Sequence, residues 1–152
     1  METSSEYIHK RHNVSVIIYH YVCPAKYRRI VINEEVDDTI KCICEEIEKR
    51  YDIRFLEIGT DKDHVHFLIQ STPKRSPSQI IQMIKSITAR EIFAKHPEVK
   101  KQLWGGQFWS DGYYVSTVGK NANEAVIAKY AHEQGREKEY KQMYVQQLSW
   151  LE

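Results

Sequence analysis

The sequence predicts a single α+β domain with an antiparallel sheet and two helices on one face of it. Four segments rich in β-branched and aromatic residues indicate strands, and two segments with helical apolar spacing separate them in the order β-α-β-β-α-β. A short polar turn joins the second and third strands, which is typical of a hairpin. This order is that of the ferredoxin-like split βαβ motif. We expect the other face of the sheet to begin bare and a C-terminal helix to lie across it.

The first strand and helix are predicted within residues 13–50. Residues 13–22 are β-branched and aromatic, and Pro24 is expected to break the strand. Asn33 can cap a helix whose first turn carries two glutamates. The helix is then marked by apolar residues at helical spacing, namely Val36, Ile40, Ile43 and Ile47.

The remaining strands and the second helix follow from residues 52–119. Residues 52–59 and 64–70 form the predicted hairpin, and residues 113–119 form the fourth strand. Between them, Pro77 is placed to open a helix at its first turn. That helix has an apolar isoleucine stripe and a second, polar stripe with two cations, made of Gln82, Lys85, Ser86 and Arg90. The segment 104–112, with two tryptophans and three glycines, is expected to be a loop.

The C-terminal part is predicted to be helical. An asparagine at 121 or 123 can cap a helix that runs through residues 124–134. Residues 136–152 look like a further amphipathic helix, whose aromatic and apolar residues suit dimerisation.

Length and composition narrow the classes of protein. A chain of 152 residues with 41% hydrophobic and 28% charged residues can bury one core, so we expect one domain over residues 1–152. No apolar run approaches the roughly 18–20 residues of a membrane span, and residues 1–13 lack the apolar region of a signal peptide. The three cysteines include no Cys-x-x-Cys, which argues against a disulfide framework. We therefore expect a cytoplasmic protein that makes no membrane contact.

The net charge does not by itself indicate a nucleic-acid-binding protein. It is only +1 at pH 7, whereas nucleic-acid-binding domains are often strongly basic. Basic residues do cluster locally, at 26–29 and at 74–75. Taken alone, each cluster is equally consistent with a solvated surface of mixed charge.

The stretch 59–70 contains a His-Val-His pair at the start of the third predicted strand. Residues i and i+2 of a strand point the same way, so His64 and His66 share a face. The alternate positions Val65, Phe67 and Ile69 are apolar and belong under the helices. Both imidazoles then lie on the opposite face, within reach of one metal ion. Without further context such a pair is more often a surface feature.

The last predicted helix supplies that context. Tyr130 and Gln134 are four residues apart and share a helix face. A tyrosine hydroxyl can act as a covalent nucleophile when a metal or a base activates it, and a glutamine oxygen can be a third metal ligand. The alternative for a helical tyrosine is packing in the core. If this helix crosses the bare sheet face, its tyrosine and glutamine meet the two histidines there.

Over residues 13–134 the chain resembles the single-tyrosine transposases of the HUH superfamily, which move insertion sequences as single-stranded DNA. The His-Val-His pair is generic, whereas the aromatic segment that ends in GYYVSTVG, followed by Tyr-x-x-x-Gln, is highly specific. The segments that carry the resemblance occur in the family's order and spacing, namely CPAKYRR (23–29), DHVHFLIQ (63–70), IKSITAR (84–90), LWGGQFWSDGYYVSTVG (103–119) and KYAHEQ (129–134).

The resemblance implies a metal site made of His64, His66 and Gln134, usually occupied by Mg²⁺ or Mn²⁺ in the family. It implies that Tyr130 is the nucleophile, which attacks a scissile phosphate in single-stranded DNA. The products would be a 5′-phosphotyrosine and a free 3′-OH, and reversal with a different 3′-OH would join strands. Because the covalent bond conserves the phosphodiester energy, no nucleotide cofactor is expected.

The resemblance also implies partners. Family members act as homodimers, in which the tyrosine helix often completes the partner's site, and they recognise subterminal DNA hairpins. Tyr27 and Trp109 are candidates for stacking on unpaired bases, with core or interface packing as the alternative for Trp109. Asp63 is either part of the turn or a support for the histidine ligand next to it. Candidates for phosphate contacts are Lys26, Arg28, Arg29, Lys85 and Arg90.

Two alternatives stay open at this point. One is a related HUH nickase, such as a replication initiator or a relaxase, although those proteins are usually larger. The other is a catalytically silent protein, such as a domesticated transposase, that only binds a single-stranded DNA hairpin. All four predicted active-site positions are filled, which favours the enzyme over the silent binder.

Overall fold

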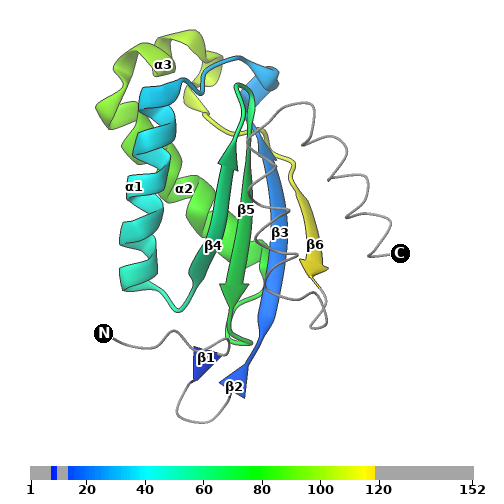
Figure 1. The fold of residues 1–152 in the computed structure, drawn as a ribbon. Helices are drawn as coiled ribbons and strands as arrows, with labels where there is room; N and C mark the ends of the chain where they lie inside the picture. Colours follow the sequence, from blue (N-terminus) through cyan, green and yellow to red (C-terminus); the bar gives the residue numbers. More distant parts are fainter. Residues whose placement is uncertain (1–7, 10–13, 119–152) are drawn as a thin grey trace.

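The computed structural model describes residues 8–9 and 14–118 of the chain (Figure 1). The predicted tyrosine-bearing helix, with Tyr130 and Gln134, and the predicted extension 136–152 lie outside the described residues. None of the helices within the described part is long and apolar enough to cross a membrane.

The sheet has four antiparallel strands in the order β4-β5-β3-β6. The central strands are β3 (Ile17–Pro24) and β5 (His64–Ser71). The edges are β4 (Arg54–Thr60), which forms the predicted hairpin with β5, and β6 (Tyr114–Val118) (Figure 1). The predicted α+β fold is confirmed, and this strand order is the one that a split βαβ connection produces.

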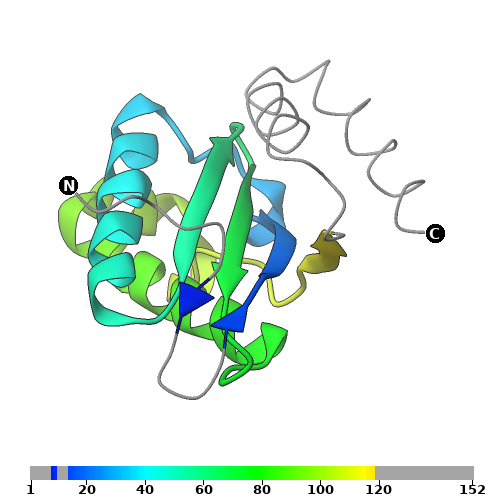
Figure 2. The same cartoon turned by 60° about the horizontal axis from the view of Figure 1, so that its bottom comes forward.

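Two helices lie on the same side of the sheet, as Figure 2 shows: α1 (Glu34–Arg50) and α2 (Pro77–Lys95). Each begins where the sequence predicts, because a side chain satisfies a backbone N–H of the first turn. Asn33 Oδ1 accepts from Val36 N at 2.9 Å. Ser76 and Gln79 form a reciprocal capping box, with distances of 3.1 and 2.9 Å, directly before Pro77 at the first helical position.

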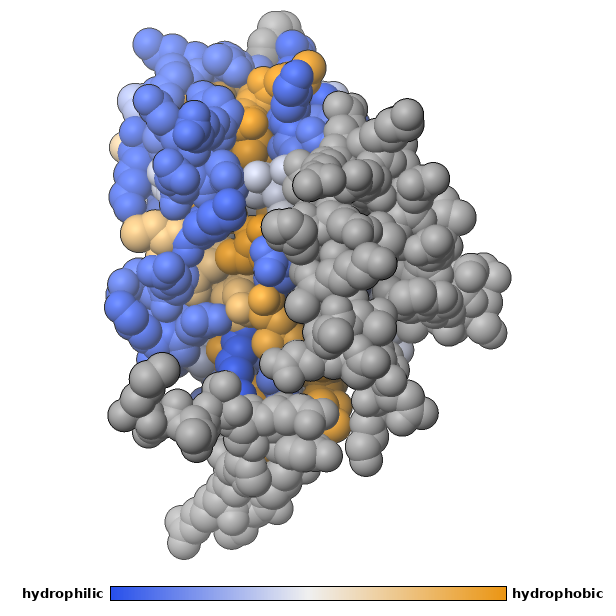
Figure 3. Space-filling model, viewed as in Figure 1, coloured by the Kyte–Doolittle hydropathy of each residue, from blue (hydrophilic) through white to orange (hydrophobic). Residues whose placement is uncertain are grey.

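The main core lies between the sheet and these helices. Val65, Phe67 and Ile69 of β5 are fully buried there, as predicted, together with Tyr21 of β3. Complete burial of such side chains stabilises the fold by roughly 1.5–3 kcal/mol each. The outward surface of α1 is hydrophilic, and hydrophobic residues gather in a band beside it over the sheet (Figure 3).

One sequence prediction about the strand boundaries was wrong. The first long strand starts at Ile17, because Val14–Ser15 form a separate strand β2 that pairs with β1 (Ile8–His9). The strand β3 ends at Pro24, where the sequence predicts its break. Between α2 and β6 the chain also forms α3 (Pro97–Gln102), which the sequence analysis did not assign. The predicted loop 104–112 begins with a 3₁₀ turn, η2 (Trp104–Gly106), in which Gly105 and Gly106 adopt φ of 81° and 68°.

Candidate metal centre and nucleic-acid surface

The two histidines of β5 come together on the sheet face opposite the helices. Val65 between them faces the core, so the imidazoles point the other way. Their ring centroids are 5.2 Å apart with an interplanar angle of 72°. His64 is 6% exposed and His66 is 1% exposed. The structure thus brings the two predicted ligands into one buried place, and their role as ligands stays a prediction.

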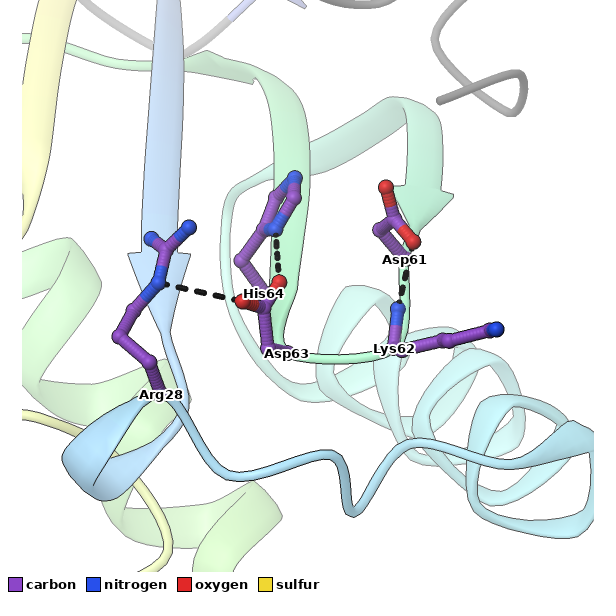
Figure 4. A network of polar contacts seen from close by, with 5 residues as sticks. All are labelled: Arg28, Asp61, Lys62, Asp63 and His64. Atoms are coloured by element: carbon purple, nitrogen blue, oxygen red, sulfur yellow. Dashed lines mark hydrogen bonds and ion pairs between the residues drawn. The ribbon is translucent and has the colours of Figure 1, made fainter. Parts of the chain in front are cut away.

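An ionic partner fixes the ring of His64. Its Nδ1 donates to Asp63 Oδ1 at 2.6 Å, and Asp63 Oδ2 accepts from Arg28 Nε at 3.2 Å (Figure 4). A carboxylate can only accept, so Nδ1 carries a proton, and in the neutral ring the lone pair is on Nε2. A metal-binding histidine commonly has this arrangement, in which a carboxylate orients the ring.

A second histidine fixes the ring of His66. Nδ1 of His66 lies 3.0 Å from Nε2 of His20, and the two rings stack with centroids 5.2 Å apart at 16°. Burial lowers the pKa of His20 to about 4. Burial, and to a lesser extent repulsion by His20 and His64 when these are protonated, hold the pKa of His66 well below its usual value. Both rings of this pair are therefore neutral at pH 7, which is the form that binds a metal.

Sequence reasoning missed His20. Its only signal is the alternation along the first predicted strand, which puts His20 and Val22 on the face opposite Tyr21. That His20 lies beside His66 also depends on the register, in which Val22 pairs with His66 and His20 with Leu68. Register between strands 46 residues apart cannot be read from one sequence.

The donor set fits a metal site that is completed by another ligand. In their neutral form, two imidazoles suit a divalent transition ion or Mg²⁺ with additional oxygen ligands. Within the described residues, no group of three His, Cys, Asp or Glu side chains could hold a metal ion. The third ligand predicted from the resemblance, Gln134, is an amide and lies outside those residues.

The predicted basic cluster 26–29 forms a tight turn after β3. Lys26–Arg28 make a 3₁₀ turn, η1, in which Tyr27 and Arg28 have φ of 58° and 53°. Tyr27 is 65% exposed, and the ammonium of Lys26 lies 5.3 Å from the centre of its ring. Arg29 is exposed. The exposed Tyr27 ring is accessible for stacking, while Arg28 is engaged by Asp63.

The two candidate cations on α2 differ in exposure. Lys85 Nζ donates to the carbonyl oxygens of Ser110 and Asp111 at 2.7 and 3.4 Å, which ties α2 to the segment before β6. Burial lowers the pKa of Lys85. Arg90 is exposed. Of the pair, Arg90 is the one placed on the surface for a phosphate.

Trp109 packs in the core, so of its two alternatives the structure favours packing over stacking on bases. The side chain is 5% exposed, and its ring meets Phe108 edge to face at 4.6 Å. Nε1 donates to Thr88 Oγ1 at 2.9 Å. The indole has an internal partner for its N–H, as a buried tryptophan usually does.

In comparison with known families, the sequence matches the family described as "Transposase IS200 like" over residues 13–134. The ISDra2 transposase TnpA of Deinococcus radiodurans is 34% identical over 116 residues, which is 76% of this chain and 82% of that protein. The transposase for insertion sequence element IS200 of Salmonella typhimurium is 32% identical over 103 residues, which is 68% of each chain.

Comparison with solved structures also finds transposases. A crystal structure of a protein from Deinococcus radiodurans R1, described as a transposase, superposes with a TM-score of 0.67 at 30% identity, over 83% of this chain and 96% of the other. A REP-associated tyrosine transposase bound to a REP hairpin superposes with a TM-score of 0.53 over 82% of this chain and 68% of the other. At 6% identity, the second comparison speaks for the fold alone.

Proposed function

The chain belongs to the family of IS200-like transposases, and we propose that it cleaves and rejoins single-stranded DNA at insertion-sequence ends through a 5′-phosphotyrosine. The observation that carries the proposal is the buried pair His64 and His66. Both rings lie on one sheet face, and each Nδ1 is engaged by a neighbouring side chain. Nε2 of each ring is then the atom suited to a metal.

The metal site of this proposal consists of His64, His66 and Gln134, with Mg²⁺ or Mn²⁺ as the ion. When bound, the ion would stabilise charge on the scissile phosphate and help to position it. The chain's own part is to orient both rings. Asp63 does this for His64, and His20 does it for His66.

Tyr130 is the proposed nucleophile. Its oxygen forms a bond to phosphorus, and the bond from phosphorus to the 3′ oxygen breaks, which leaves a 3′-OH after proton transfer. Attack by another 3′-OH reverses these bonds, releases the tyrosine and joins two strands. The number of phosphodiester-type bonds stays constant, so no nucleotide cofactor is required.

The proposed partner is single-stranded DNA that folds into a hairpin near each end. This substrate class is proposed from membership of the IS200-like family; the REP-associated transposase, which shares the fold, is described as bound to a REP hairpin. The exposed Arg29 and Arg90 suit phosphate contacts, and the exposed Tyr27 suits stacking on an unpaired base. We further propose a homodimer, with the tyrosine helix acting in its own protomer or in its partner.

A covalent-trapping assay tests the proposed function. Labelled single-stranded DNA from the gene's own flanks is mixed with the protein and Mg²⁺ or Mn²⁺, with EDTA in a parallel sample. We expect a metal-dependent adduct that survives denaturant, maps to Tyr130 by peptide mass and disappears in Tyr130→Phe, while hairpin binding stays nearly intact. Cleavage that survives in Tyr130→Phe would contradict the nucleophile. Binding without any adduct at DNA ends that carry the flanking palindromes would indicate a silent binder instead.

A further inference from the structure

A continuous polar chain connects the basic turn to the first histidine. Arg28 Nε contacts Asp63 Oδ2 at 3.2 Å, and Asp63 Oδ1 contacts His64 Nδ1 at 2.6 Å (Figure 4). Each carboxylate oxygen thus has its own partner. Because a free carboxylate can rotate about its side-chain bonds, the guanidinium on one oxygen restricts where the other oxygen points.

The backbone holds Arg28 in this place at some cost. Tyr27 and Arg28 both have left-handed φ, which disfavours residues with a Cβ by about 1–2 kcal/mol each. Such conformations persist only where the surroundings hold them. Here the segment after β3 is bonded to the turn before β5 by three backbone hydrogen bonds, from Ala25 to Asp63 at 2.8 Å and from Val31 and Ile32 to Lys62 at 3.2 and 3.0 Å.

We propose that Arg28 is a positioning residue for His64, acting through Asp63. It fixes the carboxylate that orients the imidazole, so that Nε2 faces the metal position. The inference rests on the proposed metal site and assigns Arg28 a role that a phosphate contact alone does not have. The 59% exposure of its side chain leaves the other guanidinium nitrogens accessible, so the two roles predict different measurements.

The test is the Mn²⁺ affinity of the full-length protein without DNA, measured by calorimetry. Removal of an outer-shell partner of a ligand typically weakens metal affinity by roughly 10–100-fold, and we expect Asp63→Ala to fall in this range. We expect Arg28→Ala to weaken it several-fold. Lys62→Ala is the matched control, since it removes an exposed cation from the same turn without touching the Arg28–Asp63 pair, and should leave the affinity unchanged.

A double-mutant cycle decides whether Arg28 acts through Asp63. If it does, Arg28→Ala causes no further loss of Mn²⁺ affinity in the Asp63→Ala background, and Arg28→Lys restores part of the affinity in the wild-type background. Thermal melting of each variant separates these effects from unfolding, and Arg28→Lys replaces Arg28→Ala if the latter does not fold. Unchanged Mn²⁺ affinity in Arg28→Ala, with weaker hairpin binding, would overturn the proposal in favour of a phosphate contact.

Failure of the proposed function has a different result. If the wild-type protein binds no Mn²⁺, the metal site is wrong, and the positioning role is judged in the metal-free protein by long-range ¹H–¹⁵N NMR. Arg28→Ala must then shift the ring nitrogens of His64 and leave unchanged those of His96, which is hydrogen-bonded to Thr39. Identical His64 spectra in wild type and variant would contradict the positioning role.

Discussion

His64 and His66 lie two residues apart on one strand, yet the protein supports their rings in opposite ways. The support of His64 is ionic and reaches the surface, through Asp63 at 27% and Arg28 at 59% side-chain exposure. The support of His66 is a neutral, fully buried imidazole, His20, stacked on it. The difference shows that the support of one proposed ligand comes from loops and that of the other from the sheet itself.

The ion pair that supports His64 and the buried His20 that supports His66 should therefore contribute differently to the stability of the fold. A partly exposed ion pair adds little stability, about 0–1 kcal/mol, because solvent screens it. A buried imidazole fills volume, and its loss removes the hydrogen-bonding partner from Nδ1 of His66. We expect mutations on the His64 side to change function with little change in stability, and mutations on the His66 side to change both.

The largest expected effect is loss of metal binding on removal of either proposed ligand. His64→Ala and His66→Ala should each weaken Mn²⁺ binding by at least roughly 100-fold, beyond what loss of a supporting residue causes. Calorimetry checks the affinity, and the trapping assay should show no adduct. Either variant binding Mn²⁺ as tightly as wild type would remove that histidine from the ligand set.

The next effect distinguishes the two supports by stability. His20→Ala leaves a cavity and a buried polar atom without its partner, so it should lower the free energy of unfolding by about 2–4 kcal/mol. Asp63→Ala should lower it by less than about 1 kcal/mol. Urea denaturation of both variants measures the difference. Equal losses of unfolding free energy would contradict the proposed difference between the two supports.

A smaller effect comes from restoring the polar contact. In His20→Gln the side-chain oxygen can accept from Nδ1 of His66, so Mn²⁺ affinity should recover to within several-fold of wild type. The stability should stay about 1 kcal/mol lower, since the amide does not fill the volume of the ring. Calorimetry and urea denaturation on the same preparation check both values. A His20→Gln variant no better than His20→Ala would show that His20 acts by packing alone.

The smallest effect is the response to salt. Raising NaCl from 50 to 500 mM weakens partly exposed ion pairs much more than buried contacts. Metal affinity should therefore fall more steeply with salt in wild type than in Arg28→Ala, which lacks the screened pair. Parallel Mn²⁺ titrations at both salt concentrations measure the two slopes. Equal slopes would indicate that the Arg28–Asp63 pair does not contribute to the site.

Local sequence patterns predicted the main fold correctly where local physics decides it. Asn33 and Pro77 mark helix starts because capping and a fixed φ act within one turn. The alternation in β5 placed Val65 and Phe67 in the core and His64 and His66 on the other face. These features need no knowledge of contacts between distant segments.

What could not be predicted depends on contacts between distant segments. His20 meets His66 only through the pairing of β3 with β5. The sequence predicts a phosphate contact for Arg28, and only the structure shows that the left-handed turn places Arg28 beside Asp63. The sequence predicts a surface cation at Lys85, and only the structure shows its hydrogen bond to the segment before β6. Tyr130, Gln134 and the C-terminal extension 136–152 lie outside the described residues, so their roles stay predictions.

The measurement that tests the central claim most directly is long-range ¹H–¹⁵N NMR of histidine-labelled protein, with and without Mg²⁺. The account predicts that His66 is neutral at pH 7, that Nδ1 of both rings carries a proton, and that Mg²⁺ shifts Nε2 of both rings together. A proton on Nε2 of His66 at pH 7, or Mg²⁺ that leaves both Nε2 resonances unmoved, would contradict the claim that the two histidines form half of a metal site.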